Sequence, residues 1–124
     1  MSRSILDELA PDFPIFVWHR SQHEFYLNSA ALKLANITDD YIASLSGSAK
    51  EMINIEKGHF FEQGLIAILP KLTPHLASSE QFTRGLEYTE TYYHKNGITL
   101  ACEPGGFLSK ELQTRINAVY SDTD

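Results

Sequence analysis

The sequence of 124 residues has one cysteine and few basic residues. Cys102 has no second cysteine to pair with, which excludes a disulfide scaffold and agrees with a reducing compartment. Ten Lys and Arg stand against 16 Asp and Glu, and no two basic residues are adjacent, so direct binding to nucleic-acid phosphates is not expected. No run approaches the roughly 20 apolar residues of a membrane-spanning helix. We therefore expect a cytoplasmic protein with no membrane contact.

Motifs of nucleophilic or cofactor-dependent catalysis are also missing. The sequence has no glycine-rich phosphate loop, no nucleophile elbow and no pair of cysteines. His19 and His23 have the spacing of two metal ligands on a helix, but their neighbours favour β-strands and a polar turn separates them. The sequence indicates neither a catalytic site nor a metal site, and we do not expect an enzyme.

The composition is that of an ordinary globular domain, with 43% hydrophobic and 21% charged residues. A chain of this length can bury a core without a metal or a disulfide. No repeat or low-complexity linker divides it, so residues 1–124 are expected to form one domain. A short N-terminal helix over residues 4–10 precedes a sheet with helices over residues 14–121.

Residues 14–35 predict two paired strands followed by a helix. Residues 15–18 and 25–27 are β-branched or aromatic, and the polar residues 21–23 form the turn between them. Asn28 and Ser29 then offer side-chain oxygens to the first amides of a helix over residues 30–35. We expect Asn28 to be a structural cap.

The rest of the chain predicts more helices and then more strands. A short helix capped by Thr38 closes at Gly47, and a longer helix carries Phe61, Leu65, Leu69 and Leu72 on one face, with Pro70 inside the pattern. Residues 86–94 alternate as a strand and lead through Asn96-Gly97 into a partner strand over residues 98–102. Residues 108–121 allow a helix or a strand, and we favour a strand over residues 116–120.

Several of these segments resemble a PAS domain. They are Asn28-Ser29-Ala30-Ala31 after the hairpin, the helix after Thr38, the turn Tyr93-His94-Lys95-Asn96-Gly97-Ile98, and the ending Ala118-Val119-Tyr120-Ser121-Asp122-Thr123. The resemblance implies an α+β fold: a five-stranded antiparallel sheet with short helices packed on one face around a small cavity.

The resemblance also implies a ligand pocket and a role in signal transduction. The pocket would be lined by residues at the start of the longer helix, which would cross the sheet, and of the strand over residues 86–94: His59, Phe61, Leu65, Tyr88 and Tyr92. Haem, with His59 as its axial ligand, or a flavin is a possible occupant, although no specific motif supports either cofactor. A sensory module of this kind binds a ligand or forms a homodimer, and it acts on a signalling partner or an output domain.

Two other classes of protein remain open from the sequence. A small acidic inhibitor or immunity-type protein would use its net charge of -6 against a basic partner. A small isomerase-like pocket enzyme would combine a tyrosine with carboxylates from Glu87, Glu90 and Glu103. On a regular strand Glu87 and Glu90 face opposite sides, which weighs against the enzyme.

Overall fold

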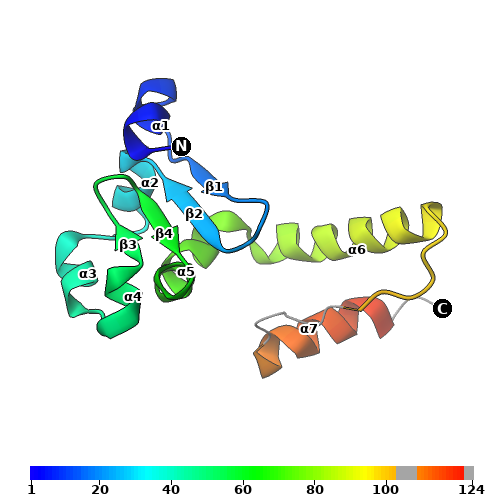
Figure 1. The fold of residues 1–124 in the computed structure, drawn as a ribbon. Helices are drawn as coiled ribbons and strands as arrows, with labels where there is room; N and C mark the ends of the chain where they lie inside the picture. Colours follow the sequence, from blue (N-terminus) through cyan, green and yellow to red (C-terminus); the bar gives the residue numbers. More distant parts are fainter. Residues whose placement is uncertain (103–108, 122–124) are drawn as a thin grey trace. The chain divides into compact units, whose positions relative to one another are not determined.

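The computed structural model describes residues 1–102 and 109–121 (Figure 1). Contacts within the chain divide it into two units, Met1–Leu76 and Ala77–Asp124, and each is described by itself. The single domain expected over residues 1–124 stays a prediction.

The first unit is an α+β structure. Its elements are, in order, α1 (Arg3–Leu9), β1 (Phe16–Trp18), β2 (Glu24–Leu27), α2 (Ser29–Leu34), α3 (Asp39–Ser44), α4 (Gly47–Glu51), β3 (Ile53–Asn54), β4 (His59–Phe61) and α5 (Gln63–Leu76). The predicted N-terminal helix, first hairpin and capped helix are confirmed, and so is the longer helix over Leu65, Leu69 and Leu72. Phe61 was expected on that helix but lies in β4, and α5 continues through Pro70 to Leu76. Gly47 was expected to close α3, but it is the first residue of α4, with φ +35.

The four strands pair in the order β1-β2-β4-β3, and every pair is antiparallel. The predicted antiparallel sheet is therefore confirmed in its coarse form. Val17, Tyr26, His59 and Asn54 form one row across the sheet, and Trp18, Phe25, Phe60 and Ile53 form the next row. Because neighbouring residues of a strand point to opposite faces, these rows belong to opposite sides of the sheet.

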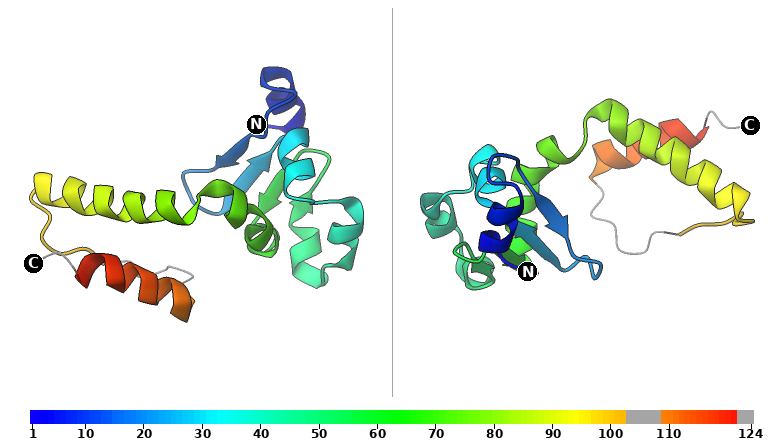
Figure 2. Two further views of the ribbon diagram at one scale, coloured as in Figure 1. Left: turned by 180° about the vertical axis from the view of Figure 1, so that it is seen from behind. Right: turned by 90° about the horizontal axis from the view of Figure 1, so that it is seen from above.

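One face of the sheet builds the core, and we call it the inner face. Phe25, Leu27 and Phe60 from the strands are fully buried against Ile68 and Leu72 of α5. Ala31 and Leu32 of α2 and Leu65 of α5 belong to the same cluster. Figures 1 and 2 show α2 and α5 on this side of the sheet. The hydrophobic stripe that predicted α5 from the sequence therefore packs on the sheet.

Asn28 is a fully buried polar residue that joins α2 to the segment before β1. Its Oδ1 accepts from the amides of Ile15 and Ala31, both at 2.9 Å. Its Nδ2 donates to the carbonyls of Ala10 at 3.0 Å and Phe13 at 2.8 Å. The predicted cap is confirmed, and the same side chain also fixes the chain between α1 and β1.

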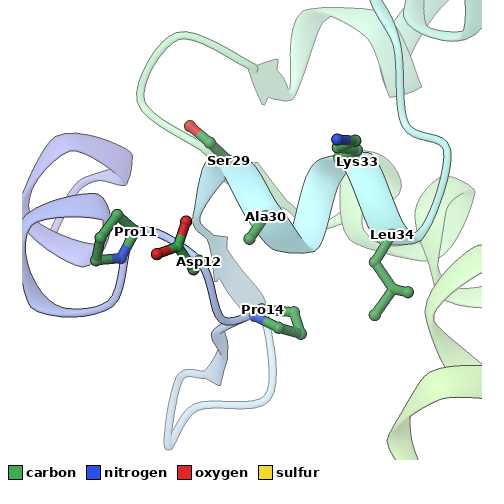
Figure 3. Close-up of a pocket in the computed structure, with 7 residues that line it drawn as sticks. All are labelled: Pro11, Asp12, Pro14, Ser29, Ala30, Lys33 and Leu34. Carbon is green, nitrogen blue, oxygen red and sulfur yellow. The ribbon is translucent and has the colours of Figure 1, made fainter.

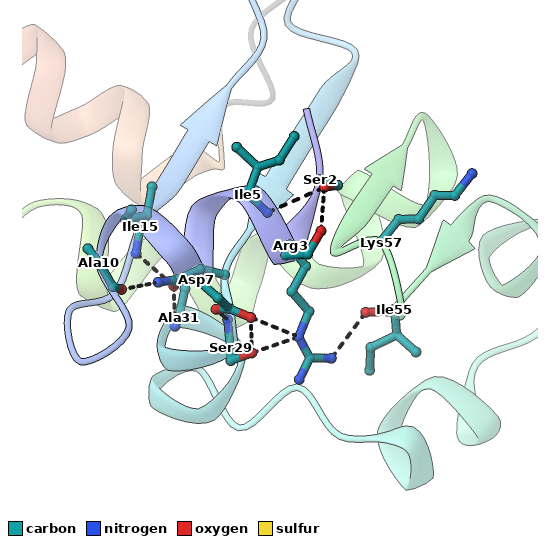
Figure 4. Close-up of polar contacts among 12 residues, drawn as sticks. Ser2, Arg3, Ile5, Asp7, Ala10, Ile15, Ser29, Ala31, Ile55 and Lys57 are labelled. Carbon is teal, nitrogen blue, oxygen red and sulfur yellow. Dashed lines mark hydrogen bonds and ion pairs between the residues drawn. The ribbon is translucent and has the colours of Figure 1, made fainter.

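A second polar network attaches α1 to the first turn of α2 (Figure 4). The Asp7 carboxylate accepts from the Ser29 amide at 2.7 Å and from the Ser29 hydroxyl at 2.6 Å. These hydrogen bonds from Ser29 lower the pKa of Asp7. Arg3 Nε donates to Ser29 Oγ at 2.8 Å, and Arg3 Nη1 donates to the Ile55 carbonyl at 3.3 Å. These hydrogen bonds hold α1 to the first turn of α2 and to the carbonyl of Ile55.

The second unit consists of α6 (Ser79–Lys95) and α7 (Lys110–Ser121). Arg115 Nη2 donates to Ser79 Oγ at 2.9 Å, and its guanidinium lies 5.1 Å from the centre of the Phe82 ring. No residue of either helix is buried. The seam between the two helices is therefore only partly shielded from water within this unit.

The strands predicted over residues 86–94 and 98–102 are wrong. Residues 86–94 lie inside α6, and no strand is present at 98–102. A complete capping box of Ser78 and Gln81 starts the helix, and Phe82, Leu86 and Tyr93 share its half-buried face. Gly97, at φ +72, ends the helix, and the Ile98 amide donates to the Tyr93 carbonyl. Asn96-Gly97, which predicted a hairpin turn, therefore closes the C-terminal end of α6.

The strand favoured over residues 116–120 is also wrong, because these residues belong to α7. The alternative, a helix with Leu112, Ile116 and Val119 on one face, agrees with the structure, and Ser109 Oγ accepts from the Leu112 amide at 3.2 Å. Leu108 and the ending after Ser121 lie outside the described residues. Within the described part of the chain the sheet has four strands, so the predicted fifth strand is not confirmed.

Replacing Asn28 with alanine should destabilise the first unit by about 3 kcal/mol, because two buried amides and two carbonyls lose their partner. Urea denaturation followed by circular dichroism measures this loss. Asn54→Ala is the control, since exposed Asn54 accepts only from the Lys57 amide and should cost less than about 1 kcal/mol. Equal losses in the two variants would contradict the importance given to Asn28.

Gly58→Ala should unfold or severely destabilise the first unit. Gly58 has φ +62, and an added Cβ would lie 2.1 Å from the Leu27 carbonyl oxygen. Gly47→Ala is the matched control, because Gly47 also has a positive φ but has open space around the added atom. We expect a loss of only about 1 kcal/mol at Gly47. Thermal denaturation of both variants checks the difference, and similar melting temperatures would refute it.

Candidate functional site

The face of the sheet opposite the core, the outer face, carries four side chains that lie together. Glu24 and Tyr26 come from β2, and His59 and Phe61 come from β4. The antiparallel register sets Glu24 beside Phe61 and Tyr26 beside His59. None of the four is buried, whereas Phe25 and Phe60 between them are. We call these four residues the outer-face cluster.

Hydrogen bonds and ring stacking fix the geometry of the outer-face cluster. Glu24 Oε2 accepts from the Tyr26 hydroxyl at 2.7 Å and from His59 Nε2 at 2.7 Å. The rings of Tyr26 and His59 stack with centres 4.6 Å apart and planes 11° apart. The Phe61 ring centre is 6.4 Å from that of His59. One carboxylate oxygen therefore positions a phenol and an imidazole in a single arrangement.

The same contacts shift the ionisation of the carboxyl and phenol groups. The hydrogen bond from the Tyr26 hydroxyl lowers the pKa of Glu24, and the bond from His59 lowers it further. The hydrogen bond to Glu24 in turn raises the pKa of Tyr26. At neutral pH the cluster thus holds a carboxylate and a protonated phenol, each stabilised by the other.

A second histidine–glutamate pair lies next to the outer-face cluster in sequence. His23 precedes Glu24, Glu62 follows Phe61, and His23 Nδ1 is 2.9 Å from Glu62 Oε1. The Glu62 amide also donates to the His23 carbonyl at 2.9 Å. Both side chains are well exposed to solvent, and the pair closes the end of the β2–β4 ladder beyond Glu24 and Phe61.

Two of the five predicted pocket residues come together and three do not. His59 and Phe61 lie in the outer-face cluster. Leu65 is buried in the core on the inner face. Tyr88 and Tyr92 belong to the second unit, where they are 71% and 53% exposed on α6. The prediction that His59, Phe61, Leu65, Tyr88 and Tyr92 line one pocket therefore finds no support in either unit.

Glu24 and Tyr26 are functional candidates that the sequence reading missed. The alternation in residues 24–27 contained a signal, because Phe25 and Leu27 are apolar and alternate with Glu24 and Tyr26, which carry polar groups. That pattern assigns Glu24 and Tyr26 to an outer face, but it does not show which strand pairs with them. The contact with His59 spans 35 positions in the sequence.

The residues around His59 do not fit a haem site. Its Nε2 is occupied by Glu24, and its ring lies flat against Tyr26 on an accessible surface. Within residues 1–102 and 109–121, no three His, Cys, Asp or Glu side chains gather as a metal site would require. Glu87 and Glu90 lie on α6, and Glu103 is outside the described residues.

An open groove of about 660 Å³ lies in a different part of the first unit (Figure 3). It is found between the segment before β1 and the exposed side of α2. Its lining is mostly apolar, with one acidic and one basic side chain: Pro11, Asp12, Pro14, Ser29, Ala30, Lys33 and Leu34. The groove is shallow and borders the start of β1, the edge strand of the sheet.

No known protein family matches this sequence, and comparisons with curated proteins and with solved structures found no match either. Among the described residues, no helix is both long enough and apolar enough to span a bilayer.

Tyr26→Phe should raise the pKa of Glu24 toward its usual value, because the phenol hydroxyl contributes the largest lowering effect. Glu24→Gln should lower the pKa of Tyr26 for the reciprocal reason. Carbon-detected NMR titration of the Glu24 carboxyl and the Tyr26 ring measures both values. An unchanged Glu24 pKa in Tyr26→Phe would show that the hydrogen bond is not formed in solution.

The lowered pKa of Glu24 determines how the stability of the folded chain should change with pH. Since Glu24 ionises at lower pH in the folded chain, its contribution to stability is fully present above its unfolded pKa. That contribution is lost as the pH falls through the folded pKa. Acid unfolding curves of the wild type and Glu24→Gln should therefore converge at low pH.

Proposed function

We propose that this chain is a PAS-like sensory or protein-interaction module of signal transduction, and that it binds a partner protein through the outer face of its sheet. The observation that carries this proposal is the outer-face cluster. Helices fill the inner face with apolar side chains, whereas the outer face presents aromatic, imidazole and carboxylate groups in a fixed arrangement.

The outer-face cluster has the properties of a binding surface. Aromatic residues dominate the energetics of protein interfaces because they offer a large apolar area with few rotatable bonds. Here Glu24 already holds Tyr26 and His59 in place, so less side-chain freedom is lost on binding. Phe61, which is 38% exposed, supplies an apolar contact beside them.

A partner-binding module is better supported than a ligand sensor with an internal pocket. The largest core side chains, including Phe25, Phe60 and Ile68, are fully buried and pack against one another. The residues expected around an internal ligand lie on the outer face, in the core and in the second unit. A partner seated on the outer face would shift the module between states according to its difference in affinity for them.

The proposal places the module in the cytoplasm, with a signalling protein or an output domain as its partner. The test is site-specific photo-crosslinking in the cells that produce the protein, with a photoreactive phenylalanine at position 61. We expect a crosslink to a signalling protein, such as a kinase, a cyclase or a transcription regulator, identified by mass spectrometry. The same probe at position 66 is the control, because Ile66 is equally exposed, at 37%, but lies on α5.

The partner found at Phe61 should bind the purified wild type in titration calorimetry and should lose at least about tenfold affinity for Phe61→Asp. Ile66→Asp should bind as the wild type does. Equal crosslinking at both positions would refute the outer face as the binding surface. A single small basic protein bound at Phe61 would favour an acidic inhibitor instead, and a small-molecule mass retained in native mass spectrometry would favour a ligand sensor.

A further inference from the structure

β1 is an edge strand, so the backbone N–H and C=O groups on its outer side have no partner strand within the described residues. The His19 amide donates to the Glu24 carbonyl at 2.9 Å, and the Asn28 amide donates to the Ile15 carbonyl at 3.3 Å. Residues 15, 17 and 19 therefore direct their backbone groups toward β2, because these directions alternate along an antiparallel strand. The N–H and C=O groups of Phe16 and Trp18 consequently point away from the sheet.

β1 is short, with three residues, but it contains no charged residue, no proline and no bulge that would prevent pairing with another strand. Large apolar side chains near it are exposed: Phe13 by 72%, Trp18 by 50% and Leu34 by 47%. The groove of Figure 3 continues this apolar surface from β1 toward α2. A strand added to this edge would cover both the backbone groups and the apolar surface.

We propose that a second copy of the chain pairs with this edge, so that two β1 strands run antiparallel about a two-fold axis at Val17. In this register Phe16 of each copy pairs with Trp18 of the other, and the outward N–H and C=O groups of both residues find partners. The arrangement uses only groups that β1 itself presents. It is isologous, as most dimer interfaces are.

Charges at the two ends of the edge favour a second copy over an unrelated strand. Arg20 follows β1 and Asp12 precedes it; both are exposed, and neither has a hydrogen bond or ion pair within the described residues. Arg20 lies in the turn that follows β1, and Asp12 lies in a bend before it. Antiparallel pairing of the two β1 strands sets the turn of one copy beside the bend of the other, within reach of a long side chain. The two-fold axis repeats this opposite-charge contact at both ends.

Pairing at β1 would join two outer faces into one. The row of Asn54, His59, Tyr26 and Val17 would continue into Val17, Tyr26, His59 and Asn54 of the second copy. Both outer-face clusters would then face the same side of an eight-stranded sheet. This inference goes beyond the proposed function and does not depend on it, since the cluster is not part of the β1 edge.

Amide hydrogen exchange of the full chain, measured by NMR at increasing protein concentration, tests the pairing directly. The Val17 amide should be protected at every concentration, because it faces β2. The Phe16 and Trp18 amides should exchange fast in dilute samples and become protected as the dimer forms. If these two amides exchange equally fast at all concentrations, or if sedimentation shows only a monomer, the proposal is overturned.

Charge exchange at the ends of the edge provides the second test. Arg20→Glu and Asp12→Arg, each alone, should weaken dimerisation roughly tenfold, because each creates two like-charge contacts. The double variant Arg20→Glu/Asp12→Arg should recover the wild-type dissociation constant, and Arg84→Glu on α6 should not change it. Sedimentation equilibrium measures all four, and a double variant as weak as the single ones would refute the register.

Val17→Lys places like charges directly at the two-fold axis and should leave the protein monomeric where the wild type is dimeric. Circular dichroism checks that the variant is folded. Phe61→Asp should dimerise as the wild type does, so loss of partner binding and loss of dimerisation are distinguishable. A dimer that persists in Val17→Lys, with Phe16 and Trp18 unprotected, would assign the interface to another surface.

Discussion

The four hydrogen bonds of Asn28 are the constraint on which the first unit depends. They join the chain after α1, the start of β1 and the first turn of α2 at one side chain that water does not reach. Neither an apolar residue nor a charged one could satisfy two donors and two acceptors there. The position of β1 relative to α2, and therefore the groove between them, follows from this one amide.

The N-terminal part of the fold could be predicted because its signals are local. The apolar runs on both sides of a polar turn determine the first hairpin, and Asn28 determines where α2 begins. The later part failed for a physical reason. Threonine and tyrosine favour strands on average, but in α6 the hydroxyls of Thr89 and Thr91 donate to carbonyls one turn earlier, and the side chains of Tyr88 and Tyr92 remain exposed. The packing of side chains along one face of α6 therefore outweighed the β-propensity of its threonines and tyrosines.

Two of the four residues of the outer-face cluster could be predicted from the sequence. His59 and Phe61 are prominent in the sequence because they adjoin a helix start, and the structure does bring them together. Their partners Glu24 and Tyr26 could not be identified, because a single sequence does not show which strands pair. β3 and β4 are short and are separated from β2 by three helices. Such a contact depends on the whole chain rather than on any local pattern.

The buried residues are divided unevenly between the two units, and this division determines how much each unit contributes to the heat-capacity change on unfolding. Every buried hydrophobic side chain in the described residues lies between Leu6 and Leu72, and α6 and α7 bury none. The heat-capacity change on unfolding arises mainly from apolar surface that becomes exposed. We therefore expect residues 1–76 to carry nearly all of the cooperative transition, and α6 and α7 to melt over a broad range with little calorimetric signal of their own.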